Sequence, residues 1–159
     1  MELYFFRHGE AEAASAGGTE AARKLTDRGK RENRAMAEAL LRAGLKPEAV
    51  FTSPLVRARQ TGEILGEVFG LPPQADEGLR PGATLSEVEA LASERGLARI
   101  MLVGHEPDLS TMIHQLTGGR AKMRTSGCAR VKVDSLSTGH GILLWLLAPD
   151  LFPASETSP

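Results

Sequence analysis

The chain has 159 residues, 42% hydrophobic and 25% charged, and this length suits one compact domain. The 19 lysines and arginines against 20 aspartates and glutamates give a net charge of −1, so charge gives no basis for general binding to nucleic acid or to a membrane surface. The single cysteine excludes a disulfide framework and a thiolate metal site, and the sequence contains neither a membrane-spanning apolar run nor a secretory signal pattern, so we expect a cytoplasmic protein.

The first half of the chain alternates short apolar runs with amphipathic stretches. Residues 3–6 are apolar without the alternation of a half-exposed strand, which is typical of a strand buried on both faces. Thr26 can cap a helix over residues 27–42, where the apolar side chains share one face. A second buried strand is expected at residues 49–51, and a second helix at residues 55–69.

The second half begins in the same way and ends differently. Thr84 opens a Thr-x-x-Glu capping box, which predicts a third helix. A third buried strand is expected at residues 100–103, and Pro107 can start a fourth helix after it. Residues 129–134 alternate valine with cations, and residues 142–148 are strongly apolar. A Ser-Thr-Gly turn separates these two segments, so they predict an antiparallel hairpin.

Together these elements predict a single-domain α/β fold. We expect a mostly parallel, twisted sheet with helices on both faces and a C-terminal antiparallel strand pair. The domain is expected to cover residues 1–152, and the polar residues 153–159 to form a flexible tail. The oligomeric state cannot be derived from these patterns.

Polar side chains with phosphate-binding chemistry follow each of the three predicted buried strands. Arg7 and His8 end the first strand, Ser53 and Arg57 follow the second, and His105 follows the third. Because the carboxyl ends of parallel strands meet at one edge of an open α/β sheet, we expect these residues to converge there.

The chemistry of this set points to a phosphoryl group. An arginine offers a planar, permanently charged fork that matches phosphoryl oxygens, and backbone N–H groups at a helix N-terminus near Pro107 can add donors. A neutral imidazole held beside such an anion can attack phosphorus and form a covalent phosphohistidine, which water later hydrolyses. The second histidine, if protonated, adds another donor to the phosphoryl oxygens. No metal ion or other cofactor is expected.

The sequence around these residues resembles the histidine phosphatase (phosphoglycerate mutase-like) superfamily. The motifs are RHGE at 7–10, TSPLVRARQT at 52–61 and VGHEP at 103–107, with LTDRG at 25–29 before the first long helix. The short chain, without an inserted helical subdomain, is most similar to the SixA-type phosphohistidine phosphatases. The resemblance implies that His8 accepts the phosphoryl group, that His105 is the second histidine of the site, and that Arg7 and Arg57 clamp the phosphate. It also implies that Ser53 is a supporting hydrogen-bond donor in phosphate binding.

One stretch departs from the pattern of many superfamily members, which carry a glutamate there as proton donor to the leaving oxygen. Here the stretch is DEGLRPG at 76–82, with Arg-Pro about where the acid would lie, and SixA-type proteins share this lack. Imidazole has a conjugate-acid pKa of ~6.5 and can leave as a neutral ring, whereas an alkoxide needs a positioned acid. The sequence therefore favours a phosphohistidine substrate on a protein, while Glu10, Glu77 and Glu106 remain possible acids.

Two other functions stay open at this point. The first is a broad or small-molecule phosphomonoesterase that acts on sugar phosphates or nucleotides, and the second is a phosphoprotein-binding module without catalysis.

A basic segment also has two interpretations. Its five cations are either a solvated surface or a docking surface for an acidic phosphoprotein. These cations are Arg120, Lys122, Arg124, Arg130 and Lys132.

Overall fold

The computed structural model describes residues 1–14 and 17–152, so the predicted tail at 153–159 lies outside the described residues. The strands are β1 (Glu2–Arg7), β2 (Ala49–Thr52), β3 (Gln74–Ala75), β4 (Arg99–Gly104), β5 (Cys128–Val133) and β6 (Gly141–Leu147). The helices are α1 (Asp27–Arg42), α2 (Val56–Phe69), α3 (Leu85–Arg95) and α4 (Asp108–Thr117). Three short 3₁₀ helices are η1 (Glu20–Ala22), η2 (Glu77–Leu79) and η3 (Pro149–Leu151).

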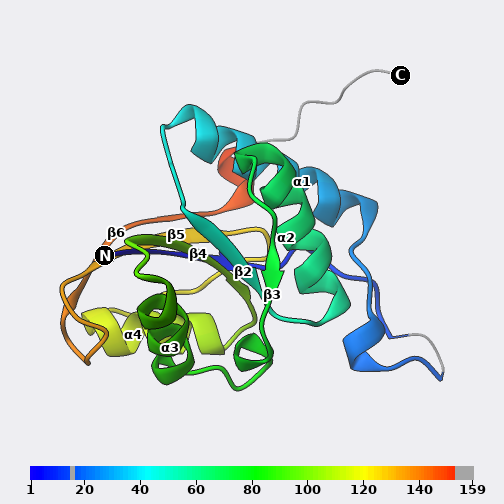
Figure 1. The fold of residues 1–159 in the computed structure, drawn as a ribbon. Coiled ribbons are helices and arrows are strands. Elements are labelled where there is room, and N and C mark those ends of the chain that lie inside the picture. The colour runs from blue at the N-terminus through cyan, green and yellow to red at the C-terminus, as the bar shows by residue number, and fades with distance from the viewer. Residues whose placement is uncertain (15–16, 153–159) are drawn as a thin grey trace.

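A six-stranded sheet with the order β3-β2-β4-β1-β5-β6 forms the centre of the molecule (Figure 1). Strands β3, β2, β4 and β1 run parallel, whereas β5 is antiparallel to β1 and β6 is antiparallel to β5. Helices α1 and α2 cover one face and α3 and α4 cover the other. The predicted α/β fold class, including the C-terminal antiparallel pair, is confirmed. The edge strand β3 was not predicted, because two residues carry no readable pattern.

The position of β1 explains its uninterrupted apolar sequence. It pairs with β4 on one side and β5 on the other, so it lies inside the sheet. Leu3 and Phe5 pack into the core beneath α3 and α4, while Tyr4 and Phe6 pack beneath α1 and α2. Since successive side chains of a strand point to opposite faces, both faces must be apolar for such a strand. This burial fixes the end of β1, where the predicted site begins.

The N-terminus of α1 packs unusually close to the segment that follows β1. Thr26 caps the helix by accepting a hydrogen bond from the backbone N–H of Gly29. A Cβ atom on Gly29 would lie 2.3 Å from the carbonyl oxygen of Glu10, and one on Gly9 would lie 2.6 Å from the Asn33 side chain. Both positions therefore need glycine for close backbone approach, and α1 holds the segment after His8 firmly in place.

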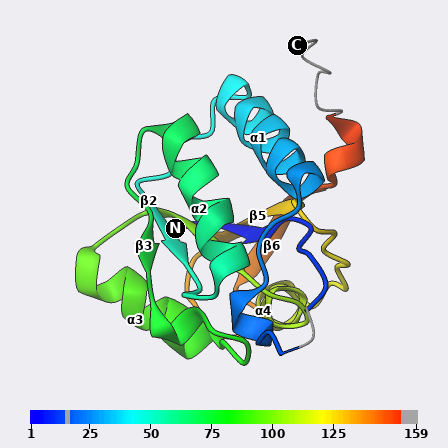
Figure 2. The ribbon, with the colours of Figure 1, turned by 90° about the vertical axis from the view of Figure 1, so that its right-hand side faces the viewer.

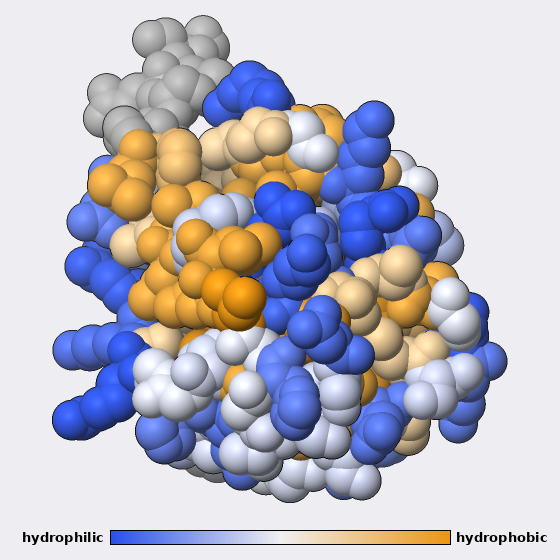
Figure 3. Space-filling model, turned by 90° about the vertical axis from the view of Figure 1, so that its left-hand side faces the viewer, coloured by the Kyte–Doolittle hydropathy of each residue, from blue (hydrophilic) through white to orange (hydrophobic). Residues whose placement is uncertain are grey.

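The strand β6 forms the predicted antiparallel pair with β5, yet its apolar side chains are partly exposed. It lies at the edge of the sheet, and Ile142, Leu144 and Leu146 are 65%, 44% and 36% exposed. On the side of the molecule shown in Figure 3, apolar side chains gather in patches between hydrophilic ones. The apolar sequence of β6 predicted the strand correctly but not its exposure, because hydropathy does not say whether a strand has one neighbour or two.

None of the described helices has the length and hydropathy that a membrane crossing requires.

Candidate active site

The five predicted site residues come together at the edge of the sheet where the parallel strands end, which faces the viewer in Figure 2. Arg7 is the last residue of β1 and His8 follows it. Ser53 follows β2, Arg57 lies in the first turn of α2, and His105 follows β4. All of these except Arg7 are buried. The strand order brings the ends of β2, β4 and β1 side by side, because β4 lies between the other two.

The hydrogen bonds of His8 define its tautomer. Its Nδ1 lies 2.8 Å from the carbonyl oxygen of Gly9, which can only accept, so Nδ1 carries the proton. Its Nε2 accepts a hydrogen bond of 3.2 Å from Nε of Arg57 and is therefore unprotonated. The backbone N–H of Gly9 donates to Oγ1 of Thr61, which fixes the carbonyl that orients the ring. The free lone pair of His8 is thus on Nε2.

His105 lies beside His8 and has the opposite tautomer. The ring centroids of the two histidines are 5.1 Å apart, with the planes tilted by 55°. Nη2 of Arg57 lies 3.4 Å from Nδ1 of His105, and because Arg57 can only donate, this Nδ1 is unprotonated. The proton on Nε2 faces Oγ of Ser53 at 2.8 Å. Arg57 therefore contacts the unprotonated nitrogen of both rings.

Burial and nearby cations keep both rings neutral at physiological pH. Desolvation by burial is the main reason that the pKa of His8 is lowered from 6.5 to about 4, and the charges of Arg57 and Arg7 add to the effect. The pKa of His105 is lowered to about 3 by burial, by His8 and by the same two arginines. Neutral imidazoles retain the lone pairs that a nucleophile or an acceptor needs.

The two arginines are only partly satisfied by the protein itself. Nη1 of Arg7 donates to the carbonyl oxygen of Met123 at 2.8 Å, while its Nε is buried with no partner among the described residues. Arg57 donates from Nη1 to the carbonyl oxygen of Glu20 at 2.9 Å, and its Nη2 lies 3.5 Å from Oε1 of Glu20. Burial lowers the pKa of Arg57 from its ordinary value, yet such a guanidinium stays charged. Glu20 is therefore the one carboxylate that lies within ion-pair distance of either guanidinium among the described residues.

Glu20 is the site residue that the sequence patterns missed. It is the first residue of η1, and its carboxylate also forms an ion pair of 2.7 Å with Arg23. These cations, Arg23 first, hold the pKa of Glu20 below its usual value. The segment before Thr26 has no apolar periodicity and matches none of the motifs, so only the tertiary fold brings Glu20 to Arg57.

The residues surround an open hollow of about 490 Å³. Glu10 and Glu106 line it, but Glu10 accepts a hydrogen bond from Thr26 and Glu106 accepts two from Ser110. Among the described residues of the lining, Pro81 represents the segment at 76–82, whereas Ser53 and Glu77 do not line the hollow. The full lining is Arg7, His8, Glu10, Ala11, Glu20, Arg23, Arg57, Pro81, His105, Glu106 and Thr125.

Two of the backbone donors that the sequence predicted at the N-terminus of α4 are bonded within the protein. Pro107 is the N-cap, as expected near the start of the helix. The N–H of Leu109, however, donates to the carbonyl oxygen of His105, and the N–H of Ser110 donates to the Glu106 carboxylate. These donors hold the segment that carries His105, because the chain turns directly into the helix after β4. Among the described residues, no cluster of three or more His, Cys, Asp or Glu side chains is arranged as a metal site.

Comparisons with known proteins identify relatives of this chain. The sequence model of the histidine phosphatase superfamily (branch 1) matches residues 3–83. Phosphohistidine phosphatase SixA of Escherichia coli is 31% identical over 157 residues, which cover 94% of each protein. An uncharacterized protein of Picosynechococcus is 40% identical over 125 residues, 76% of this chain and 75% of the relative. The solved structure of the protein histidine phosphatase SixA complexed with tungstate has a TM-score of 0.84 at 29% identity, covering 96% of this chain and 100% of that one.

Proposed function

Because this chain belongs to the histidine phosphatase superfamily, we propose that it is a phosphatase that removes the phosphoryl group from phosphohistidine on a protein. The observation that carries the mechanism is the tautomer of His8. Its Nε2 lone pair lies in the hollow beside Arg57, and its Nδ1–H is held by the Gly9 carbonyl. A buried neutral imidazole with its lone pair beside two cations is suited to attack a phosphoryl group.

The first step transfers the phosphoryl group from the substrate to His8. An incoming phosphoryl oxygen is a better acceptor for a guanidinium than a ring nitrogen is, so Arg57 turns its Nε–H and Nη2–H to the oxygens and releases both imidazoles. Arg7 binds the same oxygens. Nε2 of His8 then attacks phosphorus, and the phosphorus–nitrogen bond to the substrate breaks with its electron pair going to the substrate imidazole. The two guanidinium groups supply the positive charge that other phosphatases take from a metal.

The second step is hydrolysis of the phosphohistidine on His8. Water attacks phosphorus, the bond to Nε2 breaks, and its electron pair returns to the ring. A bound phosphoryl dianion raises the pKa of a neighbouring imidazole, since it favours the charged ring. His105 is thereby able to take a proton on Nδ1 and donate it as a hydrogen bond to the phosphoryl oxygens. Ser53, bonded to Nε2 of His105, holds that ring in position.

The leaving group favours phosphohistidine over phosphate esters. A phosphohistidine protonated on its other ring nitrogen releases a neutral imidazole, whereas an ester releases a basic alkoxide that needs a positioned acid. Pro81 occupies the stretch where many superfamily members have that acid, and the carboxylates of Glu10 and Glu106 are engaged by neighbouring hydroxyl groups. The carboxylate of Glu20 is held by cations with its pKa below the usual value, which makes it a poor proton donor.

A substrate panel tests the proposal. The purified protein is assayed without added metal on free phosphohistidine, on a phosphohistidine peptide, on acetyl phosphate as an acyl phosphate, and on a simple alkyl phosphate. We expect kcat/KM on phosphohistidine to exceed that on the alkyl phosphate by about a hundredfold or more, because only the alkoxide needs an acid. We also expect a rapid quench to trap an acid-labile phosphoenzyme.

The matched variants are His8→Asn and His114→Asn. The first removes Nε2 and should lower turnover by at least about a thousandfold and abolish the phosphoenzyme. The second changes an exposed histidine of α4 and should leave both unchanged. Equal efficiency on phosphohistidine and alkyl phosphate would instead support a broad phosphomonoesterase. Binding of phosphohistidine without turnover would support a binding module.

A further inference from the structure

The loop between α4 and β5, residues 118–127, forms one wall of the candidate active site. The carbonyl oxygen of Met123 accepts the hydrogen bond from Nη1 of Arg7, and Thr125 lines the hollow. The N–H of Ser126 lies 3.2 Å and 3.3 Å from the carbonyl oxygens of Arg7 and His8. These contacts join the loop directly to the residues that bind phosphate.

The same loop displays three cations to solvent. Met123 is buried in the core beneath α3 and α4, whereas Lys122 and Arg124 on either side of it are exposed, as is Arg120. Met123 is anchored in the core, and its carbonyl oxygen binds Arg7, which is part of the proposed phosphate clamp. Lys122 and Arg124 are the residues directly before and after Met123, so their backbone lies next to this contact. Long side chains of this kind reach across several ångströms of surface while their charge stays in water.

These cations carry charge that the protein does not neutralise. The sequence between Leu109 and Val133 contains no aspartate or glutamate. Ion pairs among the described residues include Arg28–Glu32 and Arg42–Glu38 on α1 and Arg34–Glu67 between α1 and α2. None of the ion pairs among these residues involves the cations of the loop. A folded surface that served only for solubility would gain from interspersed charges of both signs, so an unpaired cationic loop at the rim of an anion site is more useful for attracting a partner.

The five-cation segment predicted from the sequence divides into two parts in the structure. Arg130 pairs with Glu2 at 2.6 Å, and Lys132 lies opposite Glu2 in the strand register, so both belong to the end of the sheet where β1 begins. Only Arg120, Lys122 and Arg124 lie on the loop beside the site. We call these three residues the basic loop.

A second hollow lies beside Arg120 of the basic loop. It measures about 290 Å³ and is lined by Ser110, Thr111, His114, Arg120 and Ala121. Ser110 also donates to the carboxylate of Glu106, which lines the first hollow, so the two hollows have neighbouring walls at the first turn of α4. The carboxylates nearest these neighbouring walls are occupied, since Glu106 binds Ser110 and Asp108 accepts from the N–H of Gly82 at 2.7 Å.

We propose that the basic loop docks an acidic segment of the phosphorylated protein, an inference that rests on the proposed function. This acidic segment lies next to the phosphohistidine, either in the sequence or on the surface of the phosphorylated protein. The phosphoryl group enters the first hollow, and the acidic side chains nearby meet the unpaired cations of the loop. Such contacts at the rim raise the rate of association and select partners by charge. They leave the chemistry on His8 unchanged.

The test uses two peptides that differ only in charge. Each carries one phosphohistidine, flanked on both sides by aspartates in one peptide and by asparagines in the other. At low ionic strength we expect kcat/KM to be about tenfold higher for the acidic peptide, and this preference to fall to about twofold or less in high salt, because exposed charges are screened.

The paired variants are K122E/R124E and K46E/K132E, which change the charge equally. Lys46 and Lys132 are both exposed and lie toward the opposite end of the sheet. The first variant should lose or reverse the preference for the acidic peptide and hydrolyse free phosphohistidine at the rate of the unaltered protein. The second should keep the preference. Circular dichroism checks that both variants fold.

Several outcomes overturn the docking surface. An unaltered protein that does not distinguish the peptides, or a K46E/K132E variant that loses the preference equally, contradicts it. An equal fall in the K122E/R124E variant on free phosphohistidine assigns the loop to the catalytic site instead. Failure of the proposed function looks different, because then the unaltered protein hydrolyses neither peptide nor free phosphohistidine.

Discussion

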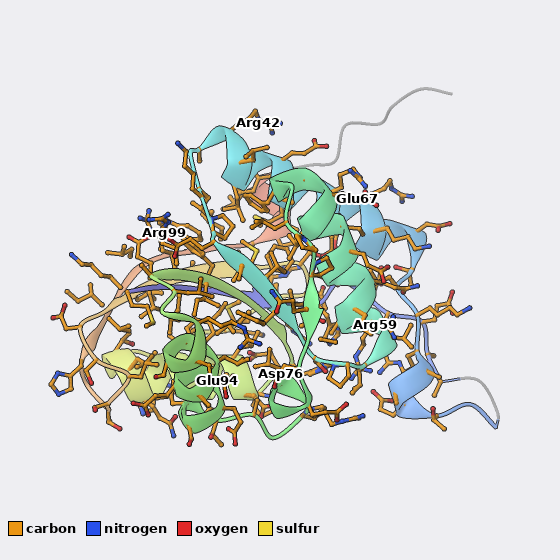
Figure 4. The ribbon with its side chains drawn as sticks, viewed as in Figure 1. Arg42, Arg59, Glu67, Asp76, Glu94 and Arg99 are labelled. Atoms are coloured by element: carbon orange, nitrogen blue, oxygen red, sulfur yellow. The ribbon has the colours of Figure 1, made fainter. Side chains whose placement is uncertain are left out.

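The charged side chains at the two ends of the same sheet are paired in different ways. Where the strands begin, Arg130 pairs with Glu2 at 2.6 Å, and Arg99 pairs with Glu48 at 3.2 Å. In Figure 4, Arg99 lies at this end, while Arg59 lies on α2 toward the end where the strands finish. The Glu48 carboxylate also accepts hydrogen bonds from two backbone N–H groups. At the beginning of the strands, each of these guanidinium groups has a carboxylate partner, so the positive charge of these two arginines is balanced within the protein.

At the other end of the sheet, the cations outnumber their partners. Arg7 uses a backbone carbonyl, and Arg57 shares the Glu20 carboxylate with Arg23 while donating to two imidazoles. Desolvation without full pairing is costly, and a folded protein tolerates it where a ligand completes the pairing. Arginines are present at both ends, so the candidate site is distinguished by arginines that lack full pairing within the protein.

Removing one arginine from each end should separate the two roles most clearly. Arg57→Ala takes away a fork that binds the phosphoryl oxygens, so we expect kcat/KM to fall by at least about a hundredfold and vanadate to bind much more weakly. Arg99→Ala removes a structural ion pair and should leave kcat/KM within about twofold, at a modest loss of stability. Steady-state kinetics, vanadate inhibition and urea unfolding measure these effects. Similar losses of activity in the two variants would show that the arginines at the two ends of the sheet do not differ in their contribution to activity.

The two ends should also lose stability in different ranges of pH. The pKa of His8 is about 4 in the folded protein against 6.5 for an ordinary histidine, so the unfolded chain binds the proton first as pH falls. Stability is therefore fully present above about pH 7 and falls between pH 6.5 and 4, by on the order of 3 kcal/mol for His8. Glu2 at the other end has a lowered pKa, mainly because Arg130 donates to it, so its contribution is lost only as pH falls below 4.5.

Urea unfolding at several pH values measures this difference. His8→Asn should remove about half of the slope of the unfolding free energy between pH 6.5 and 4, because His105, whose pKa is lowered to about 3, keeps its own share. Glu2→Gln should change the slope only below pH 4.5. His114→Asn, on the exposed side of α4, should keep the slope of the unaltered protein. A slope that is unchanged in His8→Asn would show that this buried imidazole is not one of its sources.

The sequence predicted what depends on local pattern and on strand ends. The bounds of α1 agree with the prediction, because Thr26 provides a recognisable cap. His8, Arg57 and His105 were predicted to converge because parallel strands finish at one edge, and they do. The nitrogen of His8 that carries the lone pair could not be predicted, since it depends on whether the ring donates to Gly9 or elsewhere.

Features that depend on three-dimensional neighbours were beyond the sequence. Glu20 reaches Arg57 from a segment without periodicity, 37 residues away along the chain. The five cations after α4 looked continuous, but β5 runs away from the site, and at ~3.4 Å per residue a strand of six residues carries Lys132 to the far end of the sheet. Adjacency in sequence is a poor guide to adjacency in space wherever a loop passes into a strand.

The smallest predicted effect concerns Glu20, the carboxylate that lies beside Arg57 in the candidate site. Glu20→Gln removes a negative charge 3.5 Å from Arg57 but keeps the backbone bond from Arg57 to the Glu20 carbonyl, so the arginine stays in place. Glu94→Gln is a matched control on α3, since its side chain is 70% exposed against 64% for Glu20. We expect Glu20→Gln to bind vanadate about threefold to tenfold more tightly and Glu94→Gln to bind it unchanged, because an exposed carboxylate repels an anion only weakly. If Glu20 instead supplied a proton to the leaving group, the same variant would lose kcat on alkyl phosphates. An unaltered affinity for vanadate with a lower kcat would therefore assign this carboxylate to the chemistry.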